Sequence, residues 1–245
     1  DNPEATALAL RSQFSQKPFD LSIAPLFAVI LMRLKPDHYL LSLKTHHIVA
    51  DGWSLGLILQ EIGQLYSSQN NTTKEVLTPP MQFRQYLTLR AQETQSPQML
   101  EHRDFWLKTY QEDLPTFELP TDFPRPAVKT YTGGQESQVI PSEVGQNLQK
   151  VGRKNKATLF MTMFAAYTAF LRRISGHKDL VIGIPISGRQ IEGSDNLVGF
   201  CSQFLPLRIQ VDATTSFIEH LQHTKQTLID AFRHQSYTLE DLLAA

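Results

Sequence analysis

The chain has 245 residues, enough for one large domain or two smaller ones with a sizeable hydrophobic core. Its formal net charge is -1 and its Lys and Arg residues form no arm or stripe, which argues against a nucleic-acid partner. The longest apolar run, residues 25–32, is too short to span a membrane, and no basic start of a signal peptide precedes it. Cys201, the single cysteine, excludes an internal disulfide and fits a reducing, cytoplasmic setting.

The first half of the chain is predicted to form a helix, a β-hairpin and three further helices. The helices are expected at residues 1–15, 53–66, 81–92 and 97–111, and the strands at 26–34 and 39–48. Pro36 and Asp37 between the two strands favour a short turn and therefore a hairpin. From Leu55 to Leu65 apolar residues recur at helical spacing, which indicates one face packed on a core.

The second half of the chain follows a segment rich in proline. Residues 114–134 contain four prolines and two adjacent glycines, which excludes a long helix or a central strand, so we expect an extended connection. Beyond it we predict strands at 135–140, 180–186 and 197–211, the last one bent, and helices from 142, at 159–174, at 217–233 and from about 238. The fold class is therefore mixed α and β (α+β) on both sides of the connection.

Residues 46–56, HHIVADGWSLG, contain a pattern typical of a serine nucleophile. Gly52, Ser54 and Gly56 fit the G-x-S-x-G turn between a strand and a helix. The H-G oxyanion loop expected upstream is absent, and Asp51 with Gly52 already forms the turn that ends the strand. A serine hydrolase using GWSLG is kept as an alternative, but Ser54 is better explained as a cap or first-turn residue of the helix.

The same stretch also contains a histidine pair followed by a carboxylate. His47 and Asp51 are four residues apart, as in helical zinc motifs, but the turn separates them and no third ligand stands at a recognisable spacing, so we predict no metal site. Adjacent histidines on a strand point to opposite faces, so one can face packing and the other a cleft. Asp51 is placed to fix the backbone by pairing with a cation, and a histidine can accept a proton from an attacking amine or hydroxyl near pH 7.

HHIVADG, followed by Trp53 and Ser54, resembles the HHxxxDG signature of the condensation domains of nonribosomal peptide synthetases. Six further stretches resemble motifs of that family, in the same order. They are residues 17–21, 80–90, 105–106 with 118–122, 158–161 with 182–185, 197–200 and 234–240. Because seven motifs in order are far more specific than one, the chain is identified as resembling this family along its whole length.

The resemblance implies a chloramphenicol-acetyltransferase-like fold, with two lobes in a V and the HHxxxDG loop in a tunnel between them. Residues 1–113 would be the C-terminal part of the N-lobe, 114–134 the connection, and 135–245 the N-terminal part of an incomplete C-lobe. The family's first motifs are missing and the last helix stops at Ala245, so we expect both ends to be truncated.

The resemblance also implies an activity and its partners. Carrier proteins, upstream and downstream, would present two substrates on 4'-phosphopantetheine arms, next to an adenylation domain; no cofactor would be bound by the chain itself. The amine of the acceptor thioester would attack the donor thioester carbonyl and form an amide. Neither nucleic acid nor a membrane would be involved.

Individual residues receive roles only through this resemblance. His47 would be catalytic, as a general base or as a group that positions the amine. Asp51 would pair with Arg189, His46 would face packing, and Gly52 would let the backbone N–H approach an oxyanion closely. Ser54 and Gln203 are candidates for the lining of the substrate tunnel.

Departures from the family pattern lie outside the histidine motif. Cys201 to Phe204 replace the common F-V-N-T, and Ser236 stands where an aspartate is usual, so we expect the family's activity with altered selectivity. Residues 193–195 and 205–208 are similar to condensation domains of mixed polyketide and nonribosomal assembly lines. A docking relative without catalysis remains a second alternative; it would be expected to lose the second histidine, which is present here. Cyclisation domains, with aspartates in place of the histidines, are excluded.

Overall fold

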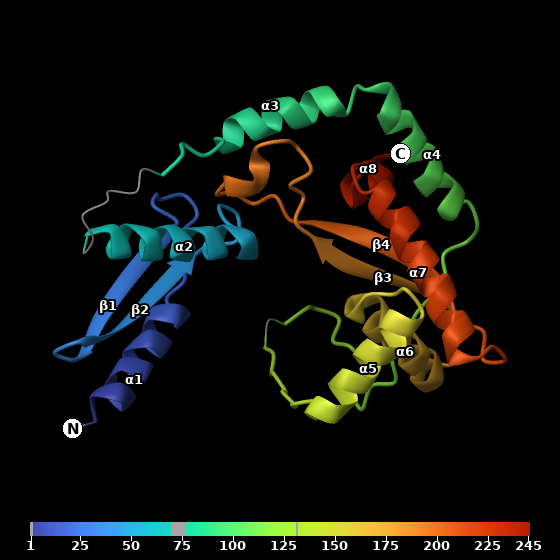
Figure 1. Ribbon diagram of the computed structural model, residues 1–245, viewed down its shortest axis with the longest axis horizontal. Helices are drawn as coiled ribbons and strands as arrows, with labels where there is room; N and C mark the ends of the chain where they lie inside the picture. The colour runs from blue at the N-terminus through green and yellow to red at the C-terminus, as the bar shows by residue number, and fades with distance from the viewer. Residues whose placement is uncertain (1, 70–76, 131) are drawn as a thin grey trace. The chain divides into compact units, whose positions relative to one another are not determined.

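The computed structural model describes residues 2–69, 77–130 and 132–245 (Figure 1). Its contacts divide the chain into two compact units. The first consists of the described residues of Asp1–Glu93 together with Ser187–Ser202, and the second of those of Thr94–Ile186 together with Gln203–Ala245. The short segment Ser187–Ser202 therefore belongs with residues far from it in sequence. The lobe boundaries expected around residues 114–134 stay a prediction.

The first unit combines helices with a two-stranded antiparallel sheet. Its elements are α1 (Pro3–Gln16), β1 (Phe27–Lys35), β2 (His38–Thr45), α2 (Gly52–Gln69), α3 (Phe83–Glu93) and the 3-10 turn η1 (Ser194–Asn196). The ladder runs from Phe27 opposite Thr45 to Lys35 opposite His38. Helix α1 packs along this hairpin, where the Nζ of Lys44 donates to the carbonyl of Phe14 at 3.0 Å. One face of the hairpin is thus covered by α1.

The second unit holds the larger hydrophobic core. Its elements are α4 (Pro97–Thr109), α5 (Ser142–Lys154), α6 (Leu159–Ser175), β3 (Asp179–Ile186), β4 (Gln203–Gln210), α7 (Phe217–Arg233) and α8 (Leu239–Ala244). Strands β3 and β4 pair antiparallel along their full length, and α7 packs on both β4 and α6. The core joins Trp106 of α4, Leu205 and Ile209 of β4, and Leu228 of α7, each at most 2% exposed.

Local signals fix the ends of several helices. Thr158 accepts a hydrogen bond from the N–H of Met161 to begin α6, and Gly176 ends that helix in the left-handed conformation, with φ 78°. Helix α7 begins with a capping box, in which Ser216 and Glu219 each bond the other's backbone N–H. These polar signals are local, which explains why the bounds of α7 match the predicted 217–233.

Two predicted strands differ from the structure. Residues 135–140 were expected to form a strand, but they have no strand assignment and Val139 is 90% exposed, because no partner strand lies beside them among the described residues. The bent strand expected at 197–211 is shorter, since only Gln203–Gln210 pairs with β3. Residues 197–202 instead form a loop whose backbone N–H groups bond to side chains near the start of α2.

Within the described ranges, no helix combines the length and the apolar character needed to cross a membrane.

Candidate active site around the histidine pair

Asp51 immediately precedes α2 and binds several of the residues around it. Its Oδ1 accepts hydrogen bonds from the N–H of Ser54 at 2.9 Å and from the hydroxyl of the same residue at 2.8 Å. The carbonyl of Asp51 accepts the N–H of Leu55 at 3.1 Å. Asp51 is therefore the N-cap of α2, a role that its type favours, and Ser54 is a residue of the first turn.

Arg189 forms a buried ion pair with Asp51. Its Nη1 donates to Oδ2 at 2.8 Å and its Nη2 to Oδ1 at 3.0 Å, and both side chains are at most 1% exposed. The guanidinium also donates to the carbonyls of Ser187, Leu197 and Gly199. Burying two charges is costly, and this arrangement offsets the cost with two parallel bonds and several backbone acceptors.

The ion pair keeps Asp51 charged. Burial by itself would raise the pKa of this carboxyl group, but hydrogen bonds from Arg189, Ser54 and the N–H of Cys201 together outweigh it. The pKa of Asp51 is therefore held well below its usual range. At neutral pH the group is a carboxylate that accepts hydrogen bonds and cannot donate a proton.

Ser54 is fully buried and its hydroxyl is surrounded by protein groups. The Oγ lies 2.8 Å from Asp51 Oδ1 and 2.9 Å from the carbonyl of Gly199, and it accepts from the N–H of Gly199 at 3.0 Å and from Arg189 Nη2 at 3.1 Å. A serine nucleophile needs an oxygen that substrate can reach, and this oxygen is fully buried. Its place in a substrate tunnel stays a prediction.

The two histidines were expected on the strand predicted at 39–48, but β2 ends at Thr45 and His47 lies in a turn, because the ladder with β1 stops at Phe27 opposite Thr45. They nevertheless have different surroundings. His46 donates its N–H to the carbonyl of Leu26 at 3.0 Å, and its Nδ1 accepts the N–H of Ile48 at 3.2 Å. The ring of His46 lies edge-on to Phe19, at 6.4 Å between centroids. His47 is exposed, and its ring lies edge-on to Phe200 at 5.1 Å with an interplanar angle of 80°.

Gly52 is the first residue of α2 and faces open space. A Cβ at this position would meet no atom of the described chain within 4 Å, and its φ is not in the left-handed range. The fold itself therefore gives no reason for a glycine here. Close approach by a bound molecule would give one.

The segment that supplies Arg189 also supplies a loop, residues 197–202, next to Asp51. The N–H groups of Cys201 and Ser202 both donate to Asp51 Oδ2, at 3.1 Å and 3.2 Å. Cys201 is buried with Leu197 and Tyr86, and burial raises the pKa of its thiol to about 11, so this cysteine is inert at neutral pH.

Gln203 starts β4 and so belongs to the second unit. Its Oε1 is buried and accepts no hydrogen bond from the described residues. Across the same described ranges, no group of three or more His, Cys, Asp or Glu side chains could hold a metal ion.

Phe200 and Gly199 are neighbours of the histidine motif that the sequence did not reveal, whereas His46, His47 and the pair of Asp51 with Arg189 were expected. The stretch 197–200 was noted only as a resemblance. Its contacts with residues near position 50 join parts of the chain about 150 positions apart, and no local pattern encodes them. Near the start of the strand predicted at 197–211, Gly199 and Phe200 suggest ordinary packing rather than a site.

Comparison with known proteins places the chain in a family. The model of the Condensation domain family matches residues 1–245, the whole chain. The chain belongs to the condensation domain family.

Several curated relatives are peptide synthetases much longer than this chain. Gramicidin S synthase 2 from Aneurinibacillus migulanus is 34% identical over 227 residues, which are 93% of this chain and 5% of that protein. Phosphinothricin tripeptide synthetase PhsC from Streptomyces viridochromogenes is 34% identical over 240 residues, which are 98% of this chain and 22% of that protein. The chain thus spans less than a quarter of these relatives.

Solved structures share the fold. The SgcC5 protein from Streptomyces globisporus matches with a TM-score of 0.83 and 25% identity, over all of this chain and 55% of that one. The condensation domain of the Monacolin K polyketide synthase MokA matches with a TM-score of 0.81 and 24% identity, over 98% of this chain and 55% of that one. The predicted fold, mixed α and β of the chloramphenicol-acetyltransferase-like class, is confirmed.

Proposed function

We propose that this chain carries the histidine motif of a condensation domain that forms amide bonds in nonribosomal peptide biosynthesis. The observation that supports this most is the match of the whole chain to the condensation family, together with an exposed His47 next to a rigidly held Asp51. The donor would be an acyl or peptidyl thioester and the acceptor an aminoacyl thioester.

The reaction follows from the groups present. The amine nitrogen of the acceptor attacks the thioester carbonyl of the donor, the C–N bond forms, the C–S bond breaks, and the sulfur leaves as a thiolate. The ammonium proton must move from nitrogen to sulfur. His47 is the group proposed to take up that proton or to orient the amine, and the N–H of Gly52 is proposed to face the oxyanion.

The roles proposed for the neighbours are structural. Asp51 and Arg189 hold the start of α2 and the loop beside it, and neither can reach water while paired. The buried Ser54 disfavours a serine hydrolase. The histidine pair disfavours a relative that only docks carriers, because such a relative has no use for an exposed second histidine.

The partners belong to the proposal as well. Carrier proteins with 4'-phosphopantetheine arms would bring both substrates, and an adenylation domain would activate the acceptor. Among the solved relatives of the fold is a four-domain nonribosomal peptide synthetase bound to AMP and glycine, of which this chain covers 18%. A cytoplasmic location fits such partners.

The test is single-turnover amide formation in the complete synthetase module that contains this chain. Both carriers are loaded with aminoacyl thioesters, and the dipeptidyl carrier is quantified by mass spectrometry. In His47→Ala the rate should fall by at least about a hundredfold, the usual contribution of proton transfer by a positioned side chain. His38→Ala changes an exposed histidine at the start of β2 and should keep the parent rate.

Two outcomes would contradict the proposal. An unchanged rate in His47→Ala would remove this histidine from the reaction. Labelling of Ser54 by a fluorophosphonate probe would favour the hydrolase instead; with a buried hydroxyl we expect no labelling.

A further inference from the structure

The loop of residues 197–202 is fastened on both sides of Phe200. On one side, the N–H of Gly199 donates to Ser54 Oγ at 3.0 Å, and its carbonyl accepts from Arg189 Nη2 at 3.3 Å. On the other side, the N–H groups of Cys201 and Ser202 donate to Asp51 Oδ2. The peptide groups that flank Phe200 are therefore tied to a single buried cluster, which leaves its backbone little freedom.

Phe200 itself is outside the core that this loop joins. Its side chain is 45% exposed, whereas Leu197 and Cys201 of the same loop are at most 3% exposed and pack with Tyr86. Burial of this ring thus contributes little to the stability of the unit. Its ring packs edge-on against the ring of His47.

The orientation of the His47 ring depends on its contact with Phe200 more than the orientation of the His46 ring depends on Phe19. The ring of His46 has a hydrogen bond from the N–H of Ile48. For the ring of His47 the described residues supply the edge-on packing against Phe200 and no hydrogen bond. Two side-chain torsions set the direction of an imidazole, and an exposed ring without a hydrogen bond needs packing to hold one rotamer.

We infer that Phe200 is a positioning residue for His47, held in place by the Asp51, Ser54 and Arg189 cluster. The inference rests on the proposed function for its kinetic consequence, although the contact itself does not. The cluster then acts on His47 from two directions. Asp51 lies four residues after His47 and caps α2, and the same carboxylate fixes the loop that presents Phe200.

The experiment compares Phe200→Leu with Phe200→Tyr in the complete synthetase module. Leu keeps apolar bulk but loses the flat ring, whereas Tyr keeps the ring at this half-exposed position. For Phe200→Leu we expect kcat for amide formation to fall about tenfold at an unchanged KM for the acceptor carrier, as for a misoriented catalytic group. Phe200→Tyr should restore kcat to within about twofold of the parent.

Phe19→Leu is the matched control, since it removes the equivalent ring from His46. It should change kcat by less than about threefold. A second readout needs no turnover: the ring resonances of His47 in protein labelled with carbon-13 histidine, assigned with His47→Gln. They should shift in Phe200→Leu, where the ring current is lost, and stay close to the parent in Phe19→Leu.

An unchanged kcat in Phe200→Leu would overturn the inference, and so would a raised KM at constant kcat, because Phe200 would then contact substrate rather than position His47. Unshifted His47 resonances would overturn it as well. A rate retained in His47→Ala would instead overturn the proposed function, and the resonances would still report on the contact between Phe200 and His47.

Discussion

The carboxylate of Asp51 accepts hydrogen bonds from several segments of the chain near the histidines. Oδ1 of Asp51 caps α2 through the N–H of Ser54, and Oδ2 accepts the N–H groups of Cys201 and Ser202, while both oxygens accept from Arg189. Aspartate side chains are mostly exposed to water, and here the residue is 1% exposed. Its charge is essential because the guanidinium beside it would otherwise be buried alone.

Asp51→Asn should therefore be strongly destabilising. The amide has the same shape but leaves Arg189 without a counter-charge and offers an NH2 group to backbone donors. We expect a loss of roughly 3 kcal/mol in the free energy of unfolding, the range measured when one partner of a buried pair is removed. Urea denaturation at neutral pH, followed by circular dichroism, measures it. Asp104→Asn is the control: this exposed carboxylate pairs with Arg103 at the surface, and its loss should cost at most about 0.5 kcal/mol.

The same variant changes the response to acid. The pKa of Asp51 in the folded state lies below its unfolded value of about 3.9, so the unfolded chain binds this proton first as the pH falls. The stabilisation is complete above that value and is lost progressively as the pH falls towards the folded pKa. A denaturation series from about pH 5 to pH 2 should show a shallower loss in Asp51→Asn than in the parent. If the free energy of unfolding fell equally with pH in both proteins, Asp51 would not be the charged group that the structure indicates.

At the scale of elements, helices were predicted well because their signals are local. The capping residues and apolar spacing of α7 lie within the helix itself. A strand needs a partner, and residues 135–140, although they have the composition of a strand, pair with no strand in the described part of the chain. Residues 197–202 show a second cause: their backbone N–H groups have better acceptors in Asp51 and Ser54 than a neighbouring strand could supply.

The sequence predicted those contacts of the site that involve residues of a recognised family motif. The pairing of Asp51 with Arg189 was expected from the family resemblance, and the structure contains this contact. The contact of His47 with Phe200 was not expected, because it depends on where a distant loop is fastened. Ser54 was expected to be a cap or a first-turn residue of α2; it is in the first turn, and Asp51 is the cap.

Gly188 lets the segment with Arg189 pass close to the loop with Cys201. Its φ is 67°, and a Cβ there would collide with the carbonyl of Cys201, which is backbone and cannot turn away. Gly188→Ala should destabilise the first unit by roughly 3 kcal/mol, since it adds a clash to a left-handed conformation. The midpoint of urea unfolding measures this change.

Gly193→Ala is the matched control for that experiment. Gly193 has φ 79° in the same segment, but its added Cβ would meet Met81 Cε at 3.5 Å, an ordinary contact. Only the conformational cost, about 1 kcal/mol, should appear. Equal losses for the two variants would show that close packing of Gly188 on Cys201 contributes nothing.

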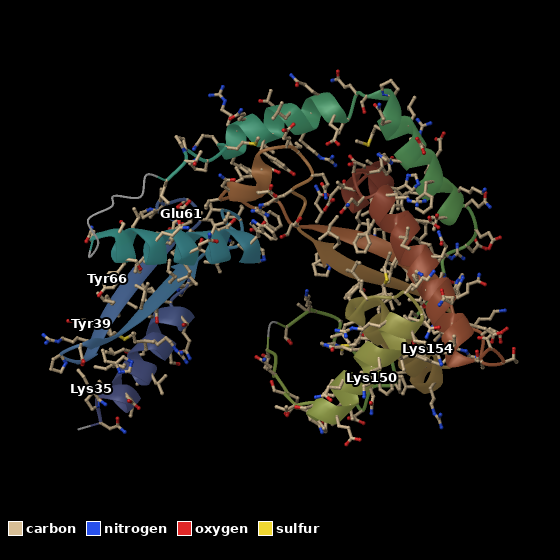
Figure 2. All side chains as sticks on the ribbon, in the orientation of Figure 1. Lys35, Tyr39, Glu61, Tyr66, Lys150 and Lys154 are labelled. Atoms are coloured by element: carbon tan, nitrogen blue, oxygen red, sulfur yellow. The ribbon has the colours of Figure 1, made fainter. Side chains whose placement is uncertain are left out.

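At the scale of the whole molecule, charge and exposed surface favour association. The formal net charge is -1, so repulsion between copies is weak near pH 7. Among the residues that the structure describes, both sheets have two strands, so each strand has one edge without a partner strand. On β1, Val29 and Leu31 are 48% and 63% exposed, on the face opposite the one that α1 covers. Tyr39, labelled near the turn of the hairpin, and Tyr66 on α2 add further exposed aromatic surface (Figure 2).

The 245-residue chain on its own should therefore self-associate through the exposed face of the hairpin. Its sedimentation coefficient should rise over about a hundredfold range of concentration at pH 7, as mass action requires. Val29→Glu with Leu31→Glu places charge on that face and should suppress the rise, because association through it would then bury unpaired carboxylates. Gln146→Glu with Gln149→Glu adds the same charge on exposed positions of α5 and should leave the rise in place. If both pairs suppressed association equally, net charge rather than the apolar face of the hairpin would be its cause.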